Sequence, residues 1–296
     1  MRQLSNELSS HISSSATNLA KCWRIKRLDG IELGFSDHDE TLEFDGSVFT
    51  PTYGADSGEV ASKLGAQTDS AEIVGIVNSA AINEDDILLG RYDGAKVESF
   101  LVNWKDVSER HHLRTDYIGE ITRIDGIFKA ELRSAQVDMN IAKGKVYQSF
   151  CNARLGENPC GIDIEDPNYK ISVTVLSLDN SFTITTSLIS GFANNWFSFG
   201  KAVWLSGKRE GKSDIIILHK NESAKSVISF SEPIIDWVNV GDNLNLYAGC
   251  DRHLSTCQDK FSNVVNFQGF PHIPGSDFIL RYPKQGNSLN GQPLFT

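Results

Sequence analysis

Four of the five cysteines form two pairs whose spacing could support a metal centre. Cys151 and Cys160 are separated by eight residues, Cys250 and Cys257 are separated by six, and about ninety residues lie between the two pairs. Thiolate sulfur binds zinc, copper(I) and iron–sulfur clusters, so the residue type alone does not choose among them. The layout favours two loops that meet, each offering two sulfur atoms to one centre.

Spacing alone leaves alternatives open. Structural zinc sites usually take their sulfurs from tight knuckles, and both intervals here are looser than that, whereas an iron–sulfur cluster is larger and accepts wider loops. Two local disulfides, or four buried free thiols, would need no metal, because cysteine is among the most buried residue types. Cys22, which precedes Trp23 in a strand-like run, is predicted to be a packed core thiol.

The elements that must position these cysteines are mostly strands. Short apolar runs are bounded by Gly, Asn, Asp and Ser, which is typical of strands and turns. Hairpin turns are predicted at Asp29–Gly30, Asp45–Gly46 and Asp125–Gly126. Helices are expected from Leu4 to about Lys21, where apolar residues fall near one face, and from Asn83 to Gly90, where Asn83 can cap the first turn.

These patterns predict a mainly β fold with a few short helices and two β-rich domains. The first domain is expected at 1–145 and the second at 146–296. Within the second, a β-barrel-like domain is expected as an insertion at about 166–246, flanked by loop-rich segments that carry the cysteines. Its strands are predicted at Ile171–Leu178, Phe182–Thr186, Ala202–Ser206, Asp214–Lys220, Lys225–Phe230 and Asn243–Ala248.

Charge and hydropathy narrow the possible partners. The formal net charge of −10 disfavours binding to nucleic acid or to anionic lipid, because both carry negative charge. No stretch approaches the roughly 18 apolar residues of a membrane span. The N-terminal residues are Ser-rich without an apolar core, so we expect the chain to fold in the cytoplasm, where a disulfide framework is disfavoured.

Three groups of histidines and acids could take part in a further site. Asp37–His38–Asp39 invites a metal or acid–base interpretation, but a polar turn with Asp side chains capping backbone donors is favoured. His111–His112 could bind zinc, although a solvated loop between strands is favoured. His253 lies inside the second cysteine interval and could contact a bound cluster or its ligands.

No activated nucleophile can be identified. Cys151 or Cys257 could pair with His253 or His272, but no enzyme signature surrounds either cysteine, so the chain is not expected to be an enzyme.

The stretch Trp196–Phe199 is rich in aromatic residues. Together with Trp204 and Trp237, it could form an interface or, equally, part of a β core.

Several motifs resemble a family of tail hub proteins found in phages and in gene transfer agents of alphaproteobacteria. The motifs are Cys22–Trp23–Arg24–Ile25, Asp29–Gly30, Gly34–Phe35–Ser36–Asp37–His38–Asp39, the stretch from Gly249–Cys250 to Pro274, and in particular Asn266–Phe267–Gln268–Gly269–Phe270–Pro271–His272–Ile273–Pro274–Gly275. The C-terminal half is also similar to the tail tip protein L of phage lambda, which holds a 4Fe–4S cluster on four cysteines. Both cysteine intervals match that protein, although the insertion between the pairs is much longer here.

The resemblance implies a structural role at the tip of a phage-like tail. It assigns Cys151, Cys160, Cys250 and Cys257 as ligands of a 4Fe–4S cluster, with zinc as the alternative. It also implies a homotrimer that joins a distal tail protein ring to a central fibre or host-recognition protein, with a tail peptidase as a further candidate partner. The particle would be assembled in the bacterial cytoplasm. A cytosolic iron–sulfur or zinc protein with a catalytic or redox role, and a zinc-stabilised adhesin, are the competing hypotheses.

Overall fold

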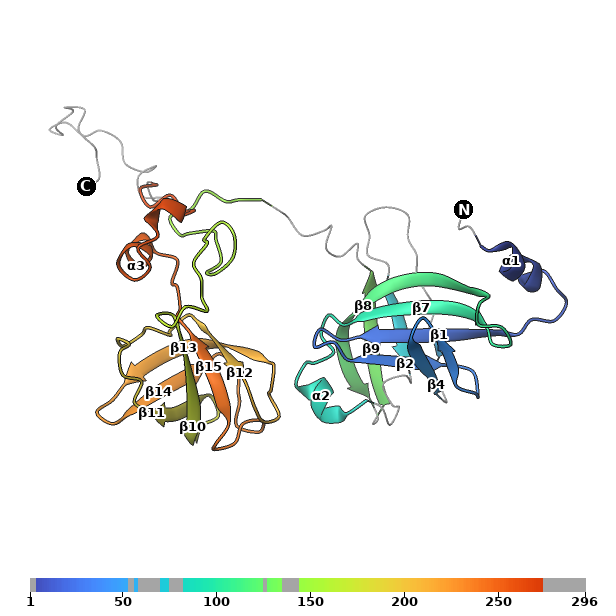
Figure 1. Cartoon of the computed structure of the whole chain (residues 1–296), viewed down its shortest axis with the longest axis horizontal. Coiled ribbons are helices and arrows are strands. Elements are labelled where there is room, and N and C mark those ends of the chain that lie inside the picture. The colour runs from blue at the N-terminus through green and yellow to red at the C-terminus, as the bar shows by residue number, and fades with distance from the viewer. Residues whose placement is uncertain are drawn as a thin grey trace, which may run out of the picture. The chain divides into compact units, whose positions relative to one another are not determined.

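The structure is a computed structural model that describes residues 4–52, 56–57, 70–74, 82–124, 127–134 and 144–273. The turn predicted at Asp125–Gly126 and the end of the C-terminal motif, Pro274–Gly275, lie outside the described residues. The chain divides into two compact units, Met1–Lys143 and Gly144–Thr296. The described residues are mainly β, as predicted, and form one nine-stranded sheet and one closed six-stranded barrel (Figure 1).

The first unit is built on the nine-stranded sheet, whose strands follow the order β3-β4-β2-β1-β7-β8-β9-β6-β5. Two short helices, α1 and α2, accompany it. The elements are α1 (Asn6–Ile12), β1 (Leu19–Lys26), β2 (Glu32–Ser36), β3 (Leu42–Phe44), β4 (Ser47–Pro51), β5 (Asp56–Ser57), β6 (Ser70–Val74), α2 (Glu84–Leu88), β7 (Lys96–Asn103), β8 (Arg110–Ile124) and β9 (Ile127–Ser134).

Turn chemistry explains the two N-terminal hairpins. Asp45 and Gly46 both have positive φ, at 51° and 74°, as a two-residue turn between antiparallel strands requires. Gly30 also has a positive φ, of 89°. At Gly34, where β2 runs parallel to β4, a Cβ atom would stand 2.1 Å from the Val48 carbonyl oxygen. Only glycine allows the two strands to approach so closely.

The helix predictions succeed at α2 and fail in part at α1. Asn83 caps α2 as predicted, since its side chain accepts a hydrogen bond from the backbone N–H of Asp85. The helix expected from Leu4 to Lys21 ends at Ile12, because Ser13 and Ser14 bond back to carbonyls of the last turn. From Leu19 onward, antiparallel pairing of β1 with β7 replaces helical hydrogen bonds.

The second unit contains the closed barrel, in the order β10-β11-β14-β13-β12-β15. Its elements are β10 (Lys170–Asn180), β11 (Thr183–Ser187), β12 (Lys201–Trp204), β13 (Ser213–Asn221), β14 (Lys225–Phe230), β15 (Asn243–Tyr247), α3 (Leu254–Asp259) and a 3₁₀ turn at Val264–Asn266. The barrel closes where β10 pairs with β15, so that Lys170 lies opposite Tyr247. Both cysteine-bearing segments therefore leave the barrel from neighbouring strand ends, and Figure 1 shows them at one end of the barrel with α3.

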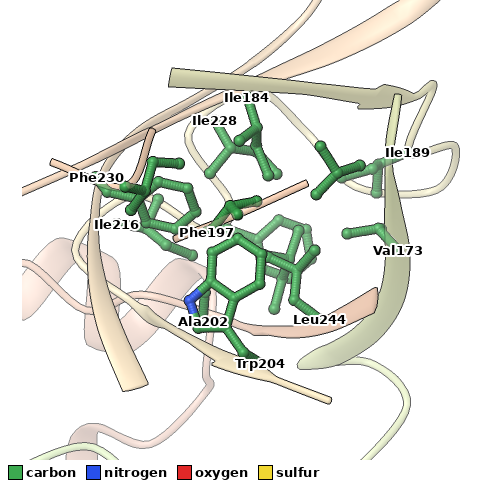
Figure 2. Close-up of a cluster of buried hydrophobic side chains, with 14 residues drawn as sticks. Val173, Ile184, Ile189, Phe197, Ala202, Trp204, Ile216, Ile228, Phe230 and Leu244 are labelled. Atoms are coloured by element: carbon green, nitrogen blue, oxygen red, sulfur yellow. The ribbon is translucent and has the colours of Figure 1, made fainter. Parts of the chain in front are cut away.

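Large apolar side chains fill the barrel. Trp204, Phe197 and Ile184 point into the space that the strands enclose (Figure 2), and each is at most 1% exposed. The indole N–H of Trp204 donates to Asp214 at 2.5 Å, and Asp214 also pairs with the buried Arg209. In the described part of the chain, no helix is long and apolar enough to cross a membrane.

Candidate metal centre

All four paired cysteines line a single pocket at one end of the barrel. Cys151 and Cys160 belong to the irregular segment before β10, Cys250 follows β15, and Cys257 lies on α3. Cys151 and Cys257 are each only 9% exposed, and all are free thiols. The structure thus brings together two pairs of sulfurs that precede and follow the barrel insertion in the sequence.

Backbone hydrogen bonds hold the two cysteine segments against each other. The Cys151 N–H donates to the Arg252 carbonyl oxygen at 2.9 Å, and the Asn152 N–H donates to the Gln268 carbonyl oxygen at 3.3 Å. The Phe270 N–H donates to Gln148 at 2.9 Å in the same region. The segment before β10 is therefore paired with the two segments that flank α3.

Three N–H groups point at cysteine sulfurs. The backbone N–H of Gln268 donates to Cys151 Sγ at 3.3 Å, and that of Arg252 donates to Cys250 Sγ at 3.4 Å. The side-chain amide of Asn263 lies 3.7 Å from Cys160 Sγ and donates to the Cys160 carbonyl oxygen at 2.7 Å. Donors of this kind stabilise thiolate sulfur, and around iron–sulfur clusters they also tune the reduction potential.

The thiols themselves disfavour a state in which all four are charged and nothing is bound. Burial raises the pKa of Cys250, and the nearby Cys151 and Cys160 raise it further. Burial likewise raises the pKa of Cys257, with contributions from the other three cysteines. Four thiolates in this pocket would repel one another, so a cationic inorganic core would remove a cost that the protein cannot remove by itself.

The donor set is all thiol, which suits either a zinc ion or an iron–sulfur core. Sulfurs that share one tetrahedral zinc ion stand about 3.8 Å apart. Within the described ranges, no three His, Cys, Asp or Glu side chains are grouped closely enough to hold one metal ion, although four thiols line the pocket. The remaining walls are largely apolar and include Leu155, Ile162, Phe261 and Phe267.

Several residues around the pocket could not be recognised from sequence spacing. Asn263 and Gln268 hydrogen-bond to sulfur, and Lys260 follows α3 directly. Gln268 belongs to the distinctive C-terminal motif, which was the only available signal for it. His253 also lines the pocket, and its ring makes an edge contact with Phe150 at 4.7 Å between centroids.

The other candidate residues have structural surroundings. Asp37 accepts a hydrogen bond from the Lys21 N–H, and the His38 ring accepts one from the Glu40 N–H, as expected for a polar turn. His111–His112 is not in a loop, which corrects the prediction, because both residues lie on β8 and pair with β7. Cys22 is fully buried, as predicted, and burial raises its pKa to about 11.

The aromatic residues in question divide between core and surface. Phe197 and Trp204 are buried in the barrel core. Phe199 is 62% exposed, and Trp196 packs on the core while it remains half-buried. Trp237 is half-buried beneath the Lys208 ammonium. The core interpretation therefore holds for two of these residues, and only Phe199 is presented to solvent.

Comparison with known proteins gives two family matches. Residues 5–163 match the family described as baseplate hub protein, N-terminal attachment domain. Residues 195–277 match a family of conserved hypothetical phage proteins. None of the curated proteins matches the chain.

A solved structure is similar over almost the whole length. One chain of the structure described as the virion of a native gene transfer agent particle is 34% identical to this chain, with a TM-score of 0.89. The match covers 98% of this chain and 100% of that chain. The likeness therefore extends over both the nine-stranded sheet and the barrel.

Proposed function

The chain belongs to the family of phage baseplate hub proteins, and from that premise we propose that it is a tail-tip subunit whose four paired cysteines hold a 4Fe–4S cluster. The baseplate role follows from the family match and from the similarity to a chain of a gene transfer agent particle. The cluster is the further step. The observation that carries it is the convergence of four thiols, from two distant segments, in one pocket.

The donor set supports a cluster better than a zinc ion. Three N–H donors point at sulfurs and the walls are apolar, which suits either centre, and among the described residues no three ligand side chains are grouped closely enough for a single ion. A cubane core places its sulfur ligands further apart than a single tetrahedral ion does. Zinc remains the alternative that elemental analysis distinguishes.

The role of the cluster is structural in this proposal. The polypeptide enters the barrel just after Cys160 and leaves it just before Cys250, so a centre bound by both pairs would cross-link the two ends of the insertion. Metal ligation of this kind supplies on the order of ten kcal/mol to the folding of a small domain. Four cysteines also fill the coordination of a cluster, which leaves no open position for a substrate on iron and argues against catalysis at the cluster.

The partners follow from the place of a hub in a tail. We propose a closed homotrimer, since such assemblies favour cyclic symmetry. One face would meet the distal tail protein ring, and the other would meet a central fibre or host-recognition protein, with a tail peptidase as an additional neighbour. The particle is a phage or a gene transfer agent, assembled in the bacterial cytoplasm.

Anaerobic purification of the full chain tests the cluster. The expected protein is brown, contains iron and acid-labile sulfide in equal amounts, and loses both when Cys151 is replaced by Ala. Protein that contains zinc and no iron would favour the zinc alternative over the cluster. Protein that contains neither zinc nor iron would reject the proposal. Cryo-electron microscopy of the intact particle tests the trimer and its neighbours in the same specimen.

A further inference from the structure

Lys260 occupies a site built for an ammonium group beside the cysteine pocket. It follows α3 directly, three positions after Cys257. Its Nζ donates to the Gly249 carbonyl oxygen at 2.7 Å and also to the Trp196 carbonyl oxygen, which lies 64 positions away in the chain. One side chain therefore joins α3, the loop before β12 and the segment that leads into Cys250.

Two aromatic rings complete the surroundings of this ammonium. Its Nζ lies 4.7 Å from the ring centroid of Trp196 and 5.3 Å from that of Phe261. Ring faces attract cations, and the attraction grows when the cation is desolvated. No carboxylate within the described ranges forms an ion pair with Lys260, so carbonyl dipoles and ring faces replace the usual partner.

The backbone around this lysine is tightly packed. The Gly249 N–H donates to the same Trp196 carbonyl oxygen at 3.0 Å. A Cβ on Gly249 would stand 1.7 Å from the Ser198 carbonyl oxygen, so only glycine fits there. The Lys260 head group therefore helps to hold Gly249, and with it the adjacent Cys250, in place.

In the chain without a bound centre, the Lys260 ammonium has no negatively charged group among the described residues in direct contact with it. Burial lowers the pKa of Lys260 to about 8, while Cys250, when it is a thiolate, and the Asp251 carboxylate act to raise it. Asp251 forms no ion pair with Lys260, and a half-buried cation without a carboxylate in contact is costly unless further negative charge compensates it. A centre ligated by four thiolates carries net negative charge and would supply that compensation.

Resting on the proposed cluster, we propose that Lys260 is the counter-cation of the four-cysteine centre: it positions the Cys250 segment through two carbonyls and makes the bound centre easier to reduce. A nearby positive charge favours the more negative, reduced form of a cluster, so its loss lowers the reduction potential. The ligand class is thus an anionic thiolate-bound cluster, recognised by an ammonium held outside the ligand shell.

The test compares reduction potentials of anaerobically purified full-length variants, measured by dye-mediated titration with electron paramagnetic resonance detection. Lys260→Met keeps the apolar stem and removes the charge, Lys260→Gln keeps a neutral N–H donor group, and Lys260→Arg keeps the charge. Lys201→Met is the matched control, because Lys201 also lies over a ring, that of Tyr247 at 5.0 Å, but on the exposed barrel surface. Iron content and thermal unfolding are recorded for each variant.

Both neutral variants should have a more negative potential than wild type, whereas Lys260→Arg and Lys201→Met should stay close to it. Equal potentials in wild type and a loaded neutral variant would overturn the inference while leaving the cluster intact. If only the two neutral variants fail to fold or to load iron, while Lys260→Arg and Lys201→Met succeed, the result would support the proposal that Lys260 positions the Cys250 segment. Absence of iron and sulfide from wild type would instead reject the proposed function on which the inference rests.

Discussion

The backbone N–H of Gln268 donates a hydrogen bond to Sγ of Cys151 at 3.3 Å and so joins two positions that are 117 residues apart in the chain. The bond links the segment before the barrel to the segment that follows α3. A reciprocal bond runs from the Asn152 N–H to the Gln268 carbonyl oxygen at 3.3 Å. The pocket is thus formed by chain segments that only folding brings together.

Replacing a ligand cysteine should abolish metal loading and strongly destabilise the second unit. In Cys151→Ala, three thiols remain in the pocket, and a cluster that needs four ligands is lost. Metal ligation of this kind supplies on the order of ten kcal/mol to folding, and its loss should lower the free energy of unfolding by several kcal/mol. Iron content and thermal unfolding measure the effect. Cys22→Ala is the matched control, because that buried thiol packs in the first unit, and it should load iron normally.

Removing the Asn263 side chain should weaken the pocket without emptying it. Asn263→Ala deletes a donor to both the carbonyl oxygen and the sulfur of Cys160, and a lost hydrogen bond of this kind costs about 1 kcal/mol. Denaturant unfolding of the loaded protein measures the cost. Asn168→Ala, which removes an exposed side-chain hydrogen bond to Asp166 and keeps the backbone one, should change stability by less. Equal effects at the two positions would count against a special role for Asn263.

The buried pair of Arg209 and Asp214 should be far more sensitive than a surface pair. Their side chains are only 7% and 4% exposed, and Asp214 also accepts the Trp204 indole N–H. Asp214→Asn leaves the Arg209 cation buried without its counter-ion, which costs about 3–5 kcal/mol. Glu222→Gln breaks exposed pairs with Lys220 and Lys225 and should cost at most about 1 kcal/mol. Chemical denaturation of both variants compares them directly.

His219 should make the barrel less stable in acid. It is fully buried against Phe197, and neither ring nitrogen finds a hydrogen-bond partner among the described residues. Burial lowers its pKa below 6.5, Asn221 acts in the opposite direction, and the positive charge of Lys260 lowers it further. Because the folded state holds His219 neutral, its contribution is fully present above about pH 6.5 and is lost as the pH falls from there toward the lowered folded pKa.

A variant isolates this contribution. His219→Phe keeps an aromatic ring in the core and cannot be protonated. Between pH 7 and pH 5, roughly spanning the histidine titration, wild-type stability should fall more steeply than that of His219→Phe in thermal unfolding experiments. His38→Phe, which changes a half-buried histidine in the first unit, should leave the slope of the second unit unchanged. Parallel curves for wild type and His219→Phe would contradict the assignment.

The sequence revealed local structure better than long-range contacts. Asp45–Gly46 predicts its hairpin because both residues tolerate positive φ, and Asn83 predicts its cap because its side chain reaches the next turn. The α1 prediction overran because apolar spacing at Leu19 suits a helix face, while pairing of β1 with β7 decides the outcome. His111–His112 looked like a charged loop because a long strand, β8, extends further than its apolar part indicates.

The site was partly visible in the same way. Four of the five cysteines occur as two closely spaced pairs, and cysteine is an uncommon residue, so they stand out in a sequence of this length. Lys260, Asn263 and Gln268 are ordinary polar residues whose importance comes from partners 64, 103 and 117 positions away. No local pattern encodes such distances, so only the folded chain identifies these residues.

The pairing of β10 with β15 has a consequence for how such a protein can change. Lys170 lies opposite Tyr247, and the Ala248 N–H donates to the Tyr169 carbonyl oxygen at 2.7 Å. The chain therefore enters and leaves the barrel at neighbouring positions. An insert whose ends leave side by side could replace it only if it also supplied the backbone contacts that Trp196 and Ser198 make with Gly249, next to Cys250. Length and sequence can therefore vary most freely in the parts of the barrel away from this junction, while the strand ends and the loop at Trp196 are constrained together.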